Sequence, residues 1–430
     1  DRFPSLTPAA PQAHLFEREM AEQMGLKPQG HPWLKPVRYR RSWREGHDAW
    51  GRPEGAPILP AVGDFFRVEG NEVHEVAVGP VHAGVIEPGH FRFQCHGERV
   101  FHLEIALGFQ HRGVEESLRG GPHRHTAARI ETLAGDTTVG HATAWAQAVE
   151  ALSATTAPPR AQAIRGIALE LERLANHAGD LGALAGDVGF LPTASYCGRL
   201  RGDFLNMTAL LCGSRFGRGL VRPGGVLFDV DDAMADELRR RLDETMKDLR
   251  GAVELLFGAA TVTARFEGTG RVDPATAESF GLVDPAARAC GVDQDVRRDH
   301  PTGIWRFAHV PVMTAHDGDV NSRAFVRWLE AQRSADFVKA QLASLPKGGV
   351  RNAPKELRPE HVAVSLVEGW RGEVCHVAVT GEDARLRRYK VVDPSFHNWM
   401  GLAMALRNEE ISDFPLCNKS FNLSYCGHDL

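Results

Sequence analysis

Residues 160–187 read RAQAIRGIALELERLANHAGDLGALAGD, and this stretch decides the fold. Its larger apolar residues recur every three or four positions, which places them on one face of a long helix. The residues of that face are Ile164, Ile167, Leu171, Leu174 and Ala178. Because a helix of this length must bury its apolar face against other elements, the sequence predicts a helical bundle around it.

Four further stretches have a helical pattern. They are residues 142–155, 193–216, 232–256 and 321–345. Asp231 and Asp232 stand at the start of the third stretch, where aspartate side chains can cap a helix. Together with residues 160–187, these stretches predict a core of roughly five helices.

The region before the helices has strand patterns instead. Residues 64–69 and 72–78 flank a Gly-Asn turn, which predicts one hairpin. Residues 91–95 and 100–105 predict a second hairpin. The loop between the two hairpins is rich in Pro and Gly, so it should take irregular turns.

The end of the chain returns to strands. Residues 373–379 and 385–392 predict a hairpin, and a polar tail beginning at Asp393 and Pro394 is expected to follow. We therefore expect an α+β fold: a helical bundle core with small antiparallel sheets from the N-terminal and C-terminal parts.

Composition limits the function. The chain has 430 residues and a net charge of -5, which gives no electrostatic reason to expect nucleic acid as a partner. No run of about 18 apolar residues occurs, so we expect no membrane span. No signal peptide is visible, and because residue 1 is Asp we expect it to be internal to a longer gene product. The basic run at residues 37–44 is interpreted as a solvated linker, with contact to a partner or to lipid headgroups as the alternative.

Several segments, in order along residues 65–430, resemble the large-subunit family shared by nickel-iron hydrogenases and respiratory complex I. They are GPVHAGVIEPGHFRF (79–93), LGFQHRGVE (107–115), LELERLANHAGDLGA (169–183), GDVNSR (318–323) and DPSFHNW (393–399). The resemblance is nearest to energy-converting, membrane-bound hydrogenases of the formate hydrogenlyase type. It implies two parts: residues 1–62 as the tail of a fused small peripheral subunit plus a linker, and residues 63–430 as the large-subunit-like domain.

The metal-binding positions of the family differ here. Hydrogenases hold nickel and iron through two Cys-x-x-Cys pairs, because these soft metals need thiolate ligands. The first motif, Cys-Gly-x-Cys-x-x-x-His, aligns with residues 134–141 and places Ala134 and Thr137 at the ligand positions. The second, fitted on Asp429, places Ser424 and Gly427 there.

Sliding the second motif by one residue would return Cys426 as a single ligand. The seven cysteines of the chain form no Cys-x-x-Cys pair, so the sequence offers no local thiolate cluster. We expect no metal or other cofactor in this chain, and we expect an iron–sulfur cluster in the adjacent partner subunit.

The loop and the segment after it hold four candidate residues. His82 and His90 could donate hydrogen bonds to a quinone headgroup or carry protons, or they could bond the backbone of their own loop. Arg112 and Glu115 could form a charge pair, either along a proton route or as a structural pair that orients the loop.

The former metal motif holds two more candidates. Asp136 and His141 could move protons, or they could be a relic of the metal pocket packed shut. The tyrosine and aspartate that bind near quinone in complex I align with Gly135 and Ala134, which weakens a quinone role. Glu170, Arg173 and His177 lie three to four residues apart and are interpreted as a local salt-bridge ladder.

The resemblance predicts one subunit of a membrane-associated oxidoreductase or translocase. It would shape the cavity beside a partner cluster and couple electron transfer to ion movement, with quinone as a candidate acceptor. The implied partners are an iron–sulfur small subunit, a ferredoxin-like subunit and membrane subunits, on the cytoplasmic side of the inner (plasma) membrane. The alternatives are a structural scaffold with a collapsed cavity and, disfavoured by the missing cysteines, an active nickel-iron hydrogenase.

Overall fold

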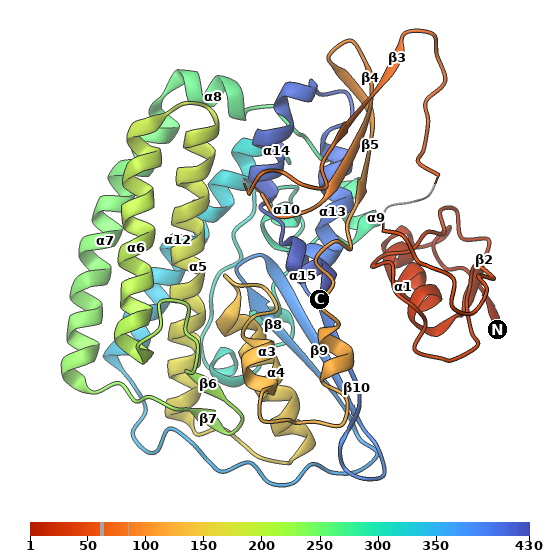
Figure 1. Ribbon diagram of the computed structural model, residues 1–430. Coiled ribbons are helices and arrows are strands. Elements are labelled where there is room, and N and C mark those ends of the chain that lie inside the picture. Colours follow the sequence, from red (N-terminus) through yellow and green to blue (C-terminus); the bar gives the residue numbers. More distant parts are fainter. Residues whose placement is uncertain (61–63, 85) are drawn as a thin grey trace.

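The long helix predicted from residue 160 is the centre of the structure (Figure 1). The computed structural model describes residues 1–60, 64–84 and 86–430. Helix α5 (Pro159–Asp187) packs against α6 (Leu191–Cys212) and α12 (Val320–Ala343), and both of these contact α7 (Asp232–Gly258). All five residues of the predicted apolar face of α5 are buried. The bundle is therefore confirmed, and its helices begin and end within a few residues of the predicted bounds.

A second layer lies beside the bundle. Strands β8 (Val362–Gly369), β9 (Gly372–Thr380) and β10 (Leu386–Val392) form an antiparallel sheet in the order β10-β9-β8. Helix α4 (Thr138–Leu152) packs between this sheet and α5. The β9–β10 hairpin confirms the prediction for the C-terminal part, whereas β8 was not predicted.

The N-terminal sheet has three strands rather than two hairpins. Strands β3 (Val73–Val78), β4 (His90–His96) and β5 (Arg99–Ala106) pair in the order β3-β4-β5. The hairpin predicted between residues 64–69 and β3 is wrong. The Phe66 N–H bonds the Glu104 carboxylate at 2.8 Å, so this segment lies against side chains of β5 instead of the edge of β3.

The polar tail predicted after Asp393 is also wrong, because it folds into three helices. They are α13 (Pro394–Ala405), α14 (Phe414–Phe421) and α15 (Tyr425–Asp429). Asp393 caps α13 by accepting the Ser395 N–H at 2.9 Å, and Pro394 occupies the first helical position, where its missing N–H costs nothing. Trp399 and Leu402 bury one face of α13 in the core.

The N-terminal segment packs onto the rest of the chain. Strand β1 (Arg2–Pro4) pairs in parallel with β2 (Lys27–Gln29), and α1 (His14–Met24) lies between them in sequence. The solvated-linker interpretation is wrong for Arg38, whose side chain is buried and ion-paired with Glu19. The predicted domain boundary between residues 62 and 63 falls outside the described residues.

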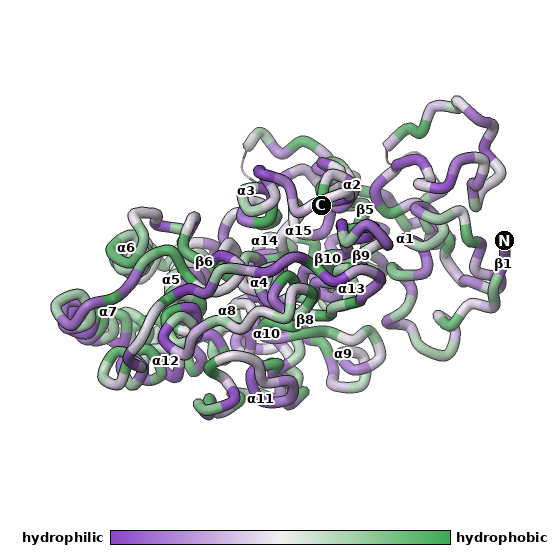
Figure 2. Tube along the Cα trace, turned by 90° about the horizontal axis from the view of Figure 1, so that it is seen from below, coloured by the Kyte–Doolittle hydropathy of each residue, from purple (hydrophilic) through white to green (hydrophobic). Residues whose placement is uncertain are grey.

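Smaller elements complete the fold. They are α2 (Val114–Ser117), α3 (Thr126–Ile130), α8 (Ala260–Phe266), α9 (Pro274–Phe280), α10 (Asp284–Arg288), α11 (Val296–Asp299), β6 (Val221–Arg222) and β7 (Gly225–Val226). Figure 2 shows the N-terminal segment at one end of the molecule and the largely hydrophilic α7 at the other. Within residues 1–60, 64–84 and 86–430, no helix is long and apolar enough to cross a bilayer. The α+β class is confirmed.

Candidate functional site

The two segments that correspond to the metal motifs meet in space, and Arg112 joins them. Its guanidinium donates to the carbonyl oxygens of Thr132 at 2.7 Å and Leu133 at 2.8 Å, directly before the first motif. It also donates to the Cys426 carbonyl at 3.2 Å, within the second motif. The Arg112 backbone N–H bonds Leu430 O at 2.9 Å. One side chain therefore fixes the spacing of the two segments.

The loop between β3 and β4 packs onto the second of these segments. The Tyr425 N–H donates to the Glu87 carboxylate at 3.2 Å. At Gly89 an added Cβ would lie 2.7 Å from the Tyr425 ring, so any larger residue would push the loop away. Residue 85 of this loop lies outside the described residues. The described part of the loop thus reaches the region where the metal motifs meet.

His82 and His90 both bond the backbone of their own loop. His82 Nε2 lies 2.7 Å from Gly89 O, and His90 Nδ1 lies 3.2 Å from Gly79 O. These contacts are the backbone bonds that one of the two interpretations of these histidines expects. A role of either histidine toward a headgroup stays a prediction.

The predicted Arg112–Glu115 pair is wrong. Gly113 lies between them with a φ of +66°, and α2 begins immediately afterwards, so the two side chains leave the backbone in different directions. Glu115 is buried and accepts from Lys390 Nζ at 2.8 Å and from the Val391 N–H at 3.0 Å. It therefore joins α2 to β10.

Asp136 pairs with Arg371 and not with His141. Its two carboxylate oxygens lie 2.6 and 2.7 Å from the guanidinium nitrogens of Arg371, which stacks on Trp370. Burial would raise the pKa of Asp136, but the Arg371 charge and hydrogen bonds bring that pKa below its usual value. The Asp136 side chain keeps 29% of its surface exposed, so this ion pair stands at the edge of the site.

His141 lies one turn inside α4, and its partner is Asp393. His141 Nε2 is 3.0 Å from Asp393 Oδ2, and both side chains are fully buried. Burial would raise the pKa of Asp393, but the hydrogen bond and charge of His141, helped by Arg371, lower it. The two candidates of the first motif therefore have separate partners, because Asp136 precedes the helix whereas His141 points from the helix toward the β9–β10 sheet.

Two further residues extend the pair into the sheet. His376 Nε2 lies 3.0 Å from His141 Nδ1, and His376 Nδ1 lies 2.8 Å from the Tyr389 hydroxyl. His141 donates to a carboxylate through Nε2, so its other nitrogen, Nδ1, must accept a hydrogen bond. This assigns the remaining protons: His376 Nε2–H donates to His141 Nδ1, and the Tyr389 O–H donates to His376 Nδ1. Burial, and then the His141 charge, hold the pKa of His376 well below its usual range, so its ring is neutral.

The chain Tyr389–His376–His141–Asp393 is thus a directed row of hydrogen bonds. Its members come from β10, β9, α4 and the cap of α13. Each imidazole accepts on one nitrogen and donates on the other, which is the arrangement that lets a proton pass along a row.

The residues at the four ligand positions do not fit a nickel-iron centre. Ala134 and Gly427 have no donor side chain, and Thr137 and Ser424 offer only hydroxyls. At Gly427 an added Cβ would lie 2.6 Å from Asp393 Cγ, so a cysteine here would collide with the buried carboxylate. Across the described ranges, no group of three or more His, Cys, Asp or Glu residues could hold a metal ion.

Cys426 does not change this result. Its sulfur lies 3.4 Å from the Ser424 hydroxyl, and burial is the main cause that raises the pKa of its thiol. A protonated thiol is a poor ligand, because the thiolate is the form that binds metal.

Glu172 on α5 is a further titratable group at the site. It accepts the Val139 N–H at 2.7 Å and the Gly140 N–H at 3.2 Å, which are in the first turn of α4. Burial raises the pKa of Glu172 to about 8 against these two hydrogen bonds, and the Asp136 charge adds to the rise. This carboxyl therefore titrates near neutral pH.

Glu172→Gln should change how stability depends on pH. Because the folded pKa is raised from 4.5 to about 8, the carboxyl must stay protonated in the folded protein while it ionises in the unfolded chain. Its contribution to the free energy of unfolding is fully present below pH 4.5. As the pH rises from 4.5 toward 8, this contribution falls by about 1.4 kcal/mol per pH unit. Urea unfolding across this range should show wild type losing stability relative to the variant. Glu254→Gln on the exposed side of α7 is the control. If the free energies of unfolding of Glu172→Gln and wild type changed with pH in parallel, the raised pKa of Glu172 would be contradicted.

The predicted ladder of Glu170, Arg173 and His177 is correct only for one pair. Arg173 Nε lies 3.2 Å from Glu170 Oε2. His177 bonds Glu330 on α12 at 2.8 Å instead. All three side chains are buried, so they belong to a network between elements and not to a solvated helix face.

Sequence reasoning missed Arg371, His376, Tyr389 and the role of Asp393. Arg371 follows a buried Trp in the β8–β9 turn, and nothing in the local pattern marks it. His376 lies on the same buried face of β9 as Val374 and Ala378, at every second position, and this alternation was a signal that its side chain is buried. Asp393 stood in a quoted motif, and the Asp-Pro pair was a signal for a helix start.

The chain is similar to known proteins over most of its length. The family described as respiratory-chain NADH dehydrogenase, 49 Kd subunit, matches residues 187–361, and the 30 Kd subunit family matches residues 1–53. Formate hydrogenlyase subunit 5 of Escherichia coli is 30% identical over 98% of this chain and 76% of that protein. Hydrogenase-4 component G of Escherichia coli is 30% identical over 98% and 75%. An NADH-quinone oxidoreductase subunit of Clostridium beijerinckii is 29% identical over 74% and 87%.

Proposed function

Because this chain belongs to the complex I-like, hydrogenase-related large-subunit family, we propose that it is a large subunit without a nickel-iron centre in a membrane-associated redox complex. In this proposal it shapes a cavity beside an iron–sulfur cluster held by a partner subunit. It couples the arrival of electrons on that cluster to the movement of an ion. The chain itself holds no metal or other cofactor.

One observation carries the proposal: the buried His141–Asp393 pair lies where the two former metal segments meet. Gly427 of the second segment approaches the Asp393 carboxylate directly, and His141 belongs to the first. Burying the Asp393 carboxylate costs free energy that an apolar residue of similar volume would not. Asp393 caps α13 through Oδ1, but the cap does not need the bond between Oδ2 and His141, so this bond supports a role of the pair in proton transfer.

The pair can respond to charge in a definite way. An electron added to a neighbouring cluster makes the potential at this region more negative, which raises the affinity of the Asp393 carboxylate for a proton. Asp136 and Arg371 link the pair to the edge of the site, and His376 and Tyr389 fix the tautomer of His141 from the other side. Uptake and release of one proton by this row would accompany each charge change.

The partners follow from the family. We propose an iron–sulfur small subunit, a ferredoxin-like subunit and membrane subunits, with this chain held on the cytoplasmic side of the membrane. Residues 1–62 are proposed to be the tail of a fused small peripheral subunit plus a linker, which the match to residues 1–53 supports. Quinone is included among the acceptors to be tested, with His82 and His90 of the loop as its candidate donors.

Asp393→Asn tests the proposal. Asparagine can still cap α13, so the complex should assemble, but the carboxylate that accepts the His141 proton is removed. Positioned proton transfer contributes about 10²–10⁴-fold to turnover, so electron transfer coupled to ion uptake should fall by at least about tenfold in membrane vesicles that carry the variant complex.

Asp383→Asn is the matched control, because Asp383 is exposed and only bonds a turn N–H of Arg385. It should leave turnover unchanged. An assembled Asp393→Asn complex with wild-type turnover would favour the scaffold instead. If metal analysis of the purified complex found one nickel per chain, the hydrogenase interpretation would be supported instead.

A further inference from the structure

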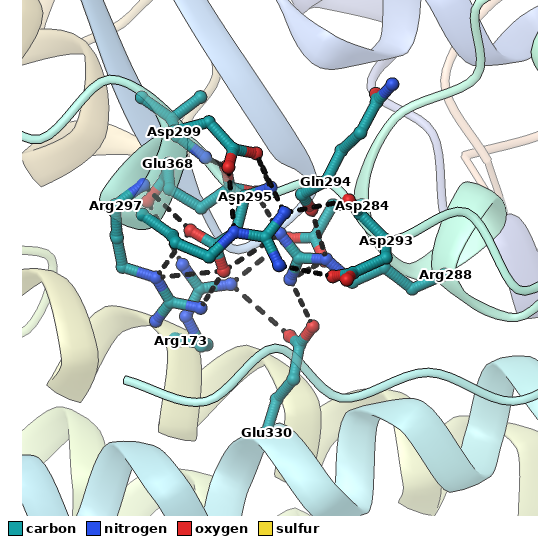
Figure 3. A network of polar contacts seen from close by, with 12 residues as sticks. Arg173, Asp284, Arg288, Asp293, Gln294, Asp295, Arg297, Asp299, Glu330 and Glu368 are labelled. Carbon is teal, nitrogen blue, oxygen red and sulfur yellow. Dashed lines mark hydrogen bonds and ion pairs between the residues drawn. The ribbon is translucent and has the colours of Figure 1, made fainter. Parts of the chain in front are cut away.

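A second buried cluster of charges lies on another face of α5 (Figure 3). Glu172 and Asn176 of this helix face α4 and Asp136, whereas Glu170, Arg173 and His177 face α12 and the turn before β9. The candidate site makes no direct use of this second cluster.

The cluster holds more negative than positive groups. Its cations are Arg173, Arg288 and Arg297, and its carboxyls are Glu170, Asp284, Asp295, Glu330 and Glu368. All eight are buried. If every group were ionised, two negative charges would remain without a cation in the interior. Such charges are strongly unfavourable, and a buried carboxyl in this situation takes up a proton.

Asp284 and Glu330 are bridged by the same two cations. Arg173 Nη1 lies 3.1 Å from Asp284 Oδ2 and 3.4 Å from Glu330 Oε2. A single nitrogen of Arg288, Nη1, likewise contacts one oxygen of each carboxyl. In Figure 3, Glu330 points from α12 toward these guanidinium groups. Arg173 and Arg288 also contact the other three carboxyls, so their two charges are divided among five carboxyls.

The other three carboxyls each have donors of their own. Glu170 accepts from Arg297 and from the Ser334 hydroxyl. Asp295 accepts from Arg297, through both its side chain and its backbone N–H. Glu368 accepts the Val296 N–H at 2.7 Å and one Arg288 nitrogen at 2.9 Å. These contacts suit ionised carboxylates at Glu170 and Asp295, whereas burial raises the pKa of Glu368. The excess of two negative charges therefore leaves Glu368 and the shared pair as the places for protons.

We propose that Asp284 and Glu330 form a buried proton-binding site that holds one proton at neutral pH, with the proton on Asp284. Glu330 stays ionised between Arg173, Arg288 and the His177 Nε2–H. The other ring nitrogen of His177, Nδ1, is buried and has no hydrogen-bond partner among the described residues. Arg327 and Asp180, which pair with each other at 2.8 Å, are the remaining charged groups packed near His177.

The direction of the pKa shifts agrees with this geometry. Burial raises the pKa of Asp284 well above its usual value, and the charges of Glu330 and Glu368 oppose the lowering by Arg288. Burial would also raise the pKa of Glu330, but the Arg288 charge and the His177 hydrogen bond bring it well below its usual value. Opposite shifts of two adjoining carboxyls are the mark of a pair that shares one proton.

Asp284→Asn and Glu330→Gln should therefore behave oppositely in the full chain. Asn replaces a neutral acid and is tolerated at the left-handed φ of +35° found at residue 284. The folding equilibrium constant of Asp284→Asn should stay within about tenfold of wild type at pH 4 and rise relative to it with pH, by up to about tenfold per unit. Glu330→Gln removes an ionised partner of two buried cations and should lower that constant by at least about a hundredfold throughout neutral pH.

The measurements are denaturant unfolding from pH 4 to 8 and infrared spectra of wild type and Asp284→Asn. Wild type should show a stronger protonated-carboxyl band at neutral pH than Asp284→Asn, in which Glu172 still contributes to the band, and the exposed Asp293→Asn control should keep the wild-type intensity. An Asp284→Asn chain that fails to fold, or that loses as much stability as Glu330→Gln with no dependence on pH, would overturn the proposal. So would an identical band in wild type and Asp284→Asn. None of these outcomes depends on the proposed function, because none measures turnover.

Discussion

Replacing Arg288 with Met should leave the chain unable to keep its fold at neutral pH. Arg288 contacts Asp284, Asp295, Glu330 and Glu368, and its Nε donates to the Gln294 carbonyl. Methionine fills a similar volume but leaves the five buried carboxyls of the cluster with two cations, Arg173 and Arg297. Removing one partner of a buried ion pair costs about 3–5 kcal/mol, which is a large part of the roughly 5–15 kcal/mol that stabilises a typical protein.

The exposed Arg298 offers the matched control for this experiment. It pairs with Asp293 and Asp299 at the surface, where an ion pair contributes about 0–1 kcal/mol. The yield of folded protein and the urea midpoint should fall sharply for Arg288→Met and remain near wild type for Arg298→Met. Equal midpoints for the two variants would mean that the buried network contributes no more than a surface pair.

Arg38→Met should release the N-terminal segment from the rest of the protein. The Arg38 guanidinium is buried, pairs with Glu19 on α1 and donates to His428 O at 2.8 and 3.1 Å. The variant leaves Glu19 with only Lys390 as a cation among the described residues, and His428 O without its donors. We expect a loss of about 3–5 kcal/mol in the docking of residues 1–60.

Limited proteolysis checks this result, because a detached segment is cut faster. Cleavage before residue 64 should accelerate in Arg38→Met while the bundle keeps its unfolding midpoint. Arg41→Met serves as the control, since residue 41 is exposed in the same basic run. If Arg38→Met and Arg41→Met were cut at the wild-type rate, the N-terminal segment would be held by other contacts.

The helical bundle could be predicted from the sequence because its signal is local. The apolar face of α5 repeats over eight turns, and Asp231 caps α7 by accepting the Met234 N–H, as expected. Strand pairing depends on residues far apart in sequence, and the segment at 64–69 had a strand pattern but met the side chain of Glu104 instead. The prediction of a polar tail was wrong for a similar reason. Asp393 is buried against α4, which lies far from it in the sequence, and not by residues next to it in the chain.

The sequence predicted where the candidate site lies but not which of its residues bond to one another. The motifs located Asp136, His141 and Arg112 correctly near the meeting of the two segments. Spacing along the chain then suggested partners three or five residues away, whereas the structure pairs Asp136 with Arg371 and His141 with Asp393, over 230 residues distant. Sequence spacing cannot show such contacts, because they arise from how α4 packs on the sheet.

The close approach of Gly427 to Asp393 also has a consequence for anyone who would rebuild a metalloenzyme from this scaffold. Grafting cysteines onto positions 134, 137, 424 and 427 supplies four sulfurs, but the last has no room while the Asp393 carboxylate stands 2.6 Å from its Cβ. A workable design must also place a smaller side chain at position 393 and supply His141 with a new hydrogen-bond acceptor. The first substitution to choose is therefore the one at the capping residue of α13.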